Sequence, residues 1–113
     1  MARVVNTVQQ IAIAGIAPSF SAGDQPNGHE FANDGNVYLE VKNTGGAPIT
    51  VTIQAPAKFG GVSLTNPTVS VPATTGDRLI GPFPTRIFNQ AAGTVYVDLS
   101  SSTGVMLAVF RLG

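Results

Sequence analysis

Hydrophobic and polar residues alternate one by one along much of this 113-residue chain. The alternation is clearest in residues 36–43, 48–54, 68–72 and 94–100, where valine, isoleucine or leucine takes every second position. Because successive side chains of a β-strand point to opposite faces, this period predicts strands with one buried and one exposed face. The buried faces are expected to form most of one core, made of Val37, Leu39, Val41, Ile49, Val51, Ile53, Val95, Val97 and Leu99.

Turn-forming residues separate the predicted strands. The chain has thirteen glycines and eight prolines, and clusters such as NDG, NTGGAP, ATTGD and SSSTG lie between the alternating segments. Short strands with turns about every 8–12 residues are typical of a β-sandwich or jelly roll. No segment predicts a helix. We therefore expect an all-β, single-domain antiparallel β-sandwich over residues 28–113. Residues 1–27 are expected to form an N-terminal arm, or an extra strand plus a loop, and residues 15–35 the longest loop.

The last predicted strand is apolar on both faces. In residues 105–112, Met106, Ala108 and Phe110 alternate with equally apolar neighbours. Since one face of a strand in an antiparallel sandwich normally meets water, the outer face of this strand should be covered. Two explanations remain open: the N-terminal segment covers it within one chain, or a neighbouring subunit does.

A proline-rich stretch, RLIGPFPTRIFNQ at residues 78–90, interrupts an apolar run. Pro82 and Pro84 lack the backbone N–H that a sheet needs, so the chain must leave regular pairing here. The intervening Phe83 has two interpretations. It is an exposed anchor for a partner, or it plugs the end of the sandwich where the chain crosses between sheets. Phe88 follows Ile87 directly, so in a strand one of the two would face outward.

Charged residues are few and balanced. Six basic and six acidic residues cancel, and together they make up 11% of the chain, against about 25% in an ordinary soluble domain. Low net charge offers little resistance to self-association, and the absence of a basic patch argues against nucleic acid as a partner. Without cysteine, the domain must be held by its core or by partners.

The N-terminal sequence is not expected to act as a signal peptide, because Asn6, Thr7, Gln9 and Gln10 interrupt the apolar core that such a peptide needs. No window contains the roughly 18 uninterrupted apolar residues of a membrane span. We expect a protein made in the cytosol, without a membrane partner.

Candidate chemistry is sparse. His29 is the sole histidine, and Glu30 and Asp34 are its nearest potential co-ligands for a metal. The favoured interpretation is that these three are loop residues bonded to backbone and water. Tyr38 and Tyr96 are too few for a sugar-binding platform and are expected to pack on outward faces. The sequence therefore predicts no enzyme, no cofactor and no metal site.

The order of several phrases along residues 28–112 resembles a known family. These phrases are L-x-V-x-N, I-T-V-T-I, V-P-A, IGPFP, F-N-Q, T-V-Y-V-D and a C-terminal V-F-R-L. The chain is similar in them to the capsid decoration, or cement, proteins of tailed bacteriophages. The resemblance implies a structural virion protein on the capsid exterior that clamps adjacent major capsid protein subunits, usually as an oligomer.

Two alternative functions stay open at this stage: a carbohydrate- or cell-surface-binding module, and a head–tail connector or tail component. Residues 2–10 are expected to be an arm ordered only by a partner, and self-association is expected to give a trimer. The candidate interface consists of Arg3, Val4, Val5, Val8, Pro82, Phe83, Pro84, Phe88, Met106 and Phe110.

Overall fold

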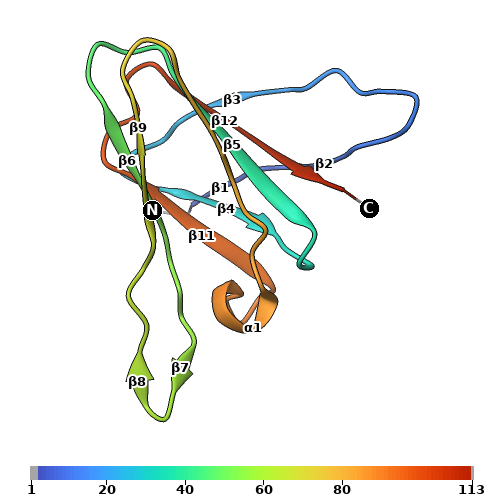
Figure 1. Ribbon diagram of the computed structural model, residues 1–113, viewed down its shortest axis with the longest axis vertical. Helices are drawn as coiled ribbons and strands as arrows, with labels where there is room; N and C mark the ends of the chain where they lie inside the picture. Colours follow the sequence, from blue (N-terminus) through green and yellow to red (C-terminus); the bar gives the residue numbers. More distant parts are fainter. Residues whose placement is uncertain (1–2, 113) are drawn as a thin grey trace.

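Two mixed β-sheets pack face to face and form a single all-β sandwich (Figure 1). The computed structural model describes residues 3–112, with Phe59 and Ser63 by their backbone alone. The first sheet has the strand order β1 (Val4–Val5), β4 (His29–Ala32), β11 (Thr94–Leu99), β6 (Ile49–Ile53) and β9 (Thr68–Val71). The second has the order β10 (Gly76–Ile80), β5 (Val37–Asn43), β12 (Val105–Arg111) and β2 (Val8–Gln10), and β3 (Ser21–Ala22) also pairs with β12. Outside them lie the hairpin β7 (Lys58–Phe59) and β8 (Val62–Ser63), and the short helix α1 (Thr85–Phe88).

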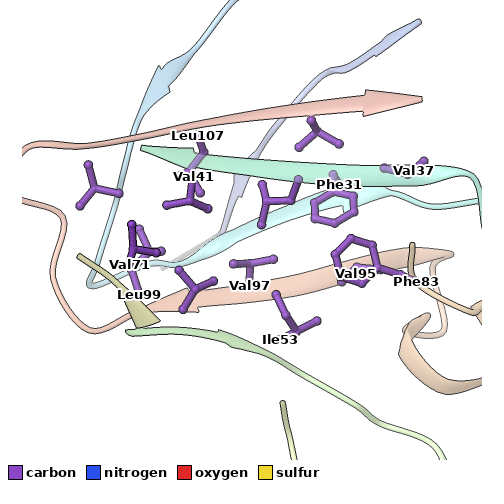
Figure 2. Close-up of a cluster of buried hydrophobic side chains, with 14 of the residues drawn as sticks. Phe31, Val37, Val41, Ile53, Val71, Phe83, Val95, Val97, Leu99 and Leu107 are labelled. Atoms are coloured by element: carbon purple, nitrogen blue, oxygen red, sulfur yellow. The ribbon is translucent and has the colours of Figure 1, made fainter. Parts of the chain in front are cut away.

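The core lies between the sheets, as the alternating pattern predicts. All nine predicted core residues are buried, with no more than 4% of their surface exposed. Figure 2 shows Val37 and Val41 of the second sheet facing Val95 and Val97 of the first. The prediction of the strand faces is confirmed. The core also contains Phe31, Val71, Phe83, Val105, Leu107 and Val109.

The N-terminal residues belong to both sheets. Val4 pairs with His29 in a parallel register, and four positions later Val8 pairs with Val109, again in parallel. The expected arm that only a partner orders is therefore wrong over residues 3–10, because the chain's own β4 and β12 supply the backbone pairing. Met1 and Ala2 of that expected arm, and Gly113 of the expected domain, lie outside the described residues. The two parallel pairings also make the sheets mixed, where an antiparallel sandwich is predicted.

The region expected to be the longest loop, residues 15–35, contains two strands, β3 and β4. β4 pairs with β11 in antiparallel register, and its Phe31 is fully buried in the core. Phe31 stands between Glu30 and Ala32, and a single apolar residue of this kind is too short a pattern to predict β4. An extended excursion, residues 11–20, joins β2 to β3, and residues 15–20 of it belong to the expected loop (Figure 1).

The outer face of β12 is covered largely within the chain. The Phe110 ring lies 5.4 Å from the Tyr38 ring and 6.5 Å from the Phe20 ring, measured between centroids. Lys42 Nζ lies 4.5 Å from the centroid of the Phe20 ring and caps this aromatic cluster. Of the two explanations for the two-sided strand, the structure favours the one within a single chain, although Met106 keeps 41% of its surface exposed.

Helix α1 is a single turn that the sequence does not predict. Pro84 precedes it with φ −56°, and its carbonyl accepts a hydrogen bond from the Phe88 N–H at 3.0 Å. A proline fits there because the first residues of a helix have no intrahelical partner for their N–H groups. Among residues 3–112, no helix has the length and apolar character to cross a membrane.

Candidate interaction surface and buried polar network

Directly after β10 comes a glycine, Gly81, that no other residue could replace without strain. Gly81 has φ +135°, and a Cβ there would lie 3.0 Å from the Tyr38 Cβ and 3.1 Å from the Val37 carbonyl oxygen. The following peptide, Gly81–Pro82, is cis. At Gly81 the chain leaves the sheet close against β5, which explains why a glycine stands inside this apolar run.

Phe83 turns inward at this point. Its side chain is 2% exposed, and its ring faces Phe31 (Figure 2) at 5.5 Å between centroids. The Phe88 ring lies 5.7 Å from it, again between centroids. Its carbonyl accepts a hydrogen bond from Asn33 Nδ2 at 2.9 Å. The interpretation of Phe83 as an exposed anchor is wrong, and the alternative, a plug at the end of the sandwich, describes it.

Beside this plug lies an apolar groove of about 490 Å³. We call it the edge groove, and its main lining residues are Val37, Tyr38, Leu79, Ile80, Pro82 and Leu112. Leu79 and Leu112 expose 67% and 68% of their surface. β10 is the last strand on this side of the second sheet, so its outer backbone edge pairs with no strand among the described residues. An apolar groove next to a free strand edge suits an extended protein segment.

The predicted interface residues do not form one patch. Only Pro82 lines the edge groove. Pro84 is exposed, and Phe88 is half-buried against the core. Sequence reasoning missed Leu79 and Leu112. The signal that could have found Leu79 is an apolar residue directly after the charged Arg78 and shortly before Pro82, where the chain leaves the sheet.

The other predicted interface residues lie in the N-terminal segment (residues 3–10) and on β12. Val5 is 70% exposed and Val4 half-buried, whereas Val8 packs against the core. Phe110 is 4% exposed, so its place in an exposed interface is corrected: its ring is held by Tyr38 and Phe20. Met106 remains partly exposed.

Arg3 is held in place by the chain itself. Its Nη1 donates to Asp98 Oδ1 at 2.8 Å and to the Val97 carbonyl at 3.3 Å, and its guanidinium carbon lies 4.3 Å from the Tyr96 ring centroid. Gln54 Nε2 donates to the other oxygen of Asp98 at 2.7 Å. Burial alone would raise the pKa of Asp98, but the hydrogen bonds from Arg3 and Gln54 lower it below its ordinary value. Arg3 therefore fastens the N-terminal segment to β11.

His29 is buried rather than placed in a loop. Its Nδ1 lies 2.7 Å from Asn6 Oδ1, and its Nε2 accepts the Asp24 backbone N–H at 2.9 Å. Burial lowers the pKa of His29, the Asp24 carboxylate opposes this effect, and Arg3 adds to it. The structure does not gather His29, Glu30 and Asp34, since Asp34 pairs with Arg111 at 3.2 Å. Within residues 3–112 no three histidine or acidic side chains are grouped to hold a metal ion.

Glu40 is the remaining acid with a shifted pKa. Burial raises the pKa of Glu40, and a hydrogen bond with Asp77 together with its negative charge raises it further, while Lys42 opposes them. Asp77 and Glu40 come from the paired strands β10 and β5. Two carboxylates on one strand pair favour the protonated form of one of them.

The tyrosines considered for sugar stacking are both covered by neighbours, Tyr38 by Phe110 and Tyr96 by Arg3. The fold and the surface together define a small β-sandwich whose most distinctive surface feature is an apolar groove at a sheet edge. No family model, curated protein or solved structure matches this chain.

Proposed function

We propose that this protein is a structural virion protein that binds the outside of an assembled bacteriophage capsid and stabilises contacts between major capsid protein subunits. The observation that carries the proposal is the edge groove, with its exposed Leu79 and Leu112 beside the free edge of β10. The resemblance of residues 28–112 to decoration proteins supports the choice of partner.

The groove is built on a stiff base. Pro82 has a fixed φ, and the buried Phe83 next to it ties the groove wall to the core. A preformed surface loses little conformational entropy on binding. Burying an exposed leucine contributes about 1.5–3 kcal/mol, so each copy gains modestly, and many copies on a symmetric shell act together.

A coat segment that adds to the edge of β10 would gain backbone hydrogen bonds, while alternate side chains of that segment enter the groove. The partners are then the major capsid protein and further copies of this chain, with a trimer as the proposed oligomer. The proposed location of the protein is the capsid exterior, after synthesis in the host bacterial cytoplasm.

The test uses particles assembled without this protein from the coat protein of the same phage. Purified wild-type protein should bind them in hundreds of copies and raise the temperature at which they rupture. The variant L79D should lose binding, because it places a carboxylate in the groove. The matched control is V62D, since Val62 is also 67% exposed but lies on the β7–β8 hairpin.

The outcomes separate the candidate functions. Equal binding by L79D and wild type would mean that the edge groove does not contact the capsid. A copy number of about six or twelve per particle would instead indicate a ring-shaped connector. Absence of wild-type binding to particles would overturn the proposed function.

A further inference from the structure

His29 is hydrogen-bonded in a way that only its neutral form permits. The Asp24 backbone N–H can only donate, so the Nε2 atom that accepts it at 2.9 Å must carry no proton. The proton of the neutral ring is then on Nδ1, which donates to Asn6 Oδ1 at 2.7 Å. Asn6 in turn donates from Nδ2 to Ser21 Oγ at 2.8 Å. Both ring nitrogens are thus satisfied, in a side chain that is 1% exposed.

These bonds meet where the N-terminal segment crosses between the sheets. Asn6 lies between β1, in the first sheet, and β2, in the second, and its own N–H donates to the Glu30 carbonyl at 2.8 Å. On the other side of the ring, Asp24 begins a turn that Gly28 closes by donating to the Asp24 carbonyl at 2.9 Å. The Gly28 carbonyl then accepts the Val4 N–H at 3.1 Å. The imidazole therefore joins the N-terminal segment to the 24–28 turn.

We propose that His29 is an acid-sensitive latch, whose protonation releases the N-terminal segment and the 24–28 turn from the sandwich. A proton on Nε2 points at the Asp24 N–H, so that two donors face each other and a charge is buried. Moving Asp24 away relieves both costs, because it admits water to Nε2. This inference does not depend on the proposed function.

The charged groups around the ring set the direction of the response. Arg3, on the N-terminal segment, opposes a second positive charge, and its charge is already paired with Asp98 of β11. The Asp24 carboxylate favours the imidazolium, but it also accepts hydrogen bonds from Asn27. Glu30, the next residue of β4, is half-buried. Since burial outweighs Asp24, the folded protein holds the proton more weakly than the unfolded chain does, and the latch weakens as pH falls below the ordinary pKa of 6.5.

The strands that the latch holds are short and lie at the edges of the two sheets. β1 has two residues and β2 three, and Val5 is 70% exposed. Short edge strands with little buried surface open locally at a lower free energy than the core strands. Their release would uncover the edges of β4 and β12 with which they pair.

The test is nuclear magnetic resonance of the ¹⁵N-labelled full chain. At pH 7.5 the His29 ring should be the Nδ1–H tautomer, which its ring nitrogen shifts report. As the pH falls from 7.5 to 5, the hydrogen-exchange protection factors of the Asn6 and Asp24 amides should fall by up to about tenfold per pH unit below 6.5, the ordinary pKa that the released histidine regains, and should level off below the folded pKa. Those of β5 should stay constant. An Nε2–H tautomer, or protection that does not change with pH, would overturn the latch.

Two variants isolate the imidazole. H29Q keeps a neutral acceptor and should remove the pH response, so a response that persists at the same pH would contradict the proposal. N6D places a carboxylate against Nδ1, which stabilises the imidazolium in the closed state, so the fall in protection between pH 7.5 and pH 5 should become smaller. An unchanged pH response in N6D would count equally against the latch, and this second variant keeps the test decisive where H29Q fails to fold.

Discussion

At the scale of single residues, Gly28 has two requirements that only glycine meets. Its φ is +76°, a region that other residues enter at a cost. A Cβ there would also lie 2.7 Å from Asp98 Oδ1 and in contact with Arg3 Nη1. The backbone at Gly28 therefore leaves room for the ion pair that fastens the N-terminal segment to β11.

The substitution G28A should destabilise the protein by about 3 kcal/mol, because it combines backbone strain with displacement of the Arg3–Asp98 pair. The control is G61A, whose φ is +80° and whose Cβ would have no neighbour within 4 Å. It should cost only about 1 kcal/mol. Urea denaturation of both variants measures the two losses, and equal losses would mean that the crowding at Gly28 has no effect.

At the scale of elements, burial differs sharply between leucines on neighbouring strands. Leu39 of β5 is 1% exposed, whereas Leu79 of β10 is 67% exposed. Truncation of a buried leucine removes its transfer free energy and leaves a cavity, so L39A should cost about 2–5 kcal/mol. L79A should stay within about 0.5 kcal/mol. A similar loss in both variants, measured by urea denaturation, would mean that the strand faces are misassigned.

The N-terminal segment should contribute to stability rather than wait for a partner. Deletion of residues 3–10 removes β1, β2 and the core contact of Val8, so the melting temperature should fall by several degrees. Val8→Ala should account for more of that fall than Val5→Ala, since Val5 is 70% exposed. If the deletion left the melting temperature unchanged, the segment would be an arm that adds nothing to the stability of the sandwich.

Strands with three or more alternating apolar positions, such as β5, β6 and β11, were predictable from the sequence. A strand that is buried on one face needs an apolar residue at every second position, and this repeat is visible in the sequence. β4 was not, since its two buried positions are His29 and Phe31, and only one of them is apolar. β1 and β2 pair in parallel with strands far away in sequence, which no local pattern encodes. At the site, the prolines predicted where the chain leaves the sheet. They could not predict that Phe83 faces inward, because that direction depends on Phe31 and Phe88 from other elements.

At the scale of the whole molecule, the surface keeps apolar residues on two separate elements of the second sheet. Met106 of β12 and Leu79 of β10 are both exposed, and the net charge is zero. We expect the isolated protein to self-associate, with a trimer as the favoured state, and M106K to weaken the association. Sedimentation of the wild type and M106K at tens of micromolar measures this, with V62K as the control. A monomer at every concentration would contradict the expectation.

The parallel pairing of β2 with β12 has a consequence for how the chain folds as it is made. Gln10 and Arg111, whose side chains are hydrogen-bonded at 2.8 Å, are 101 positions apart. A ribosome releases β2 long before β12, so sheet edges stay open throughout synthesis. Contacts this distant also slow folding, because a long loop must close before they form. Nascent chains stalled before residue 105 should therefore be sensitive to proteases and prone to aggregation, and the N-terminal strand becomes protected only when the last strand leaves the ribosomal tunnel.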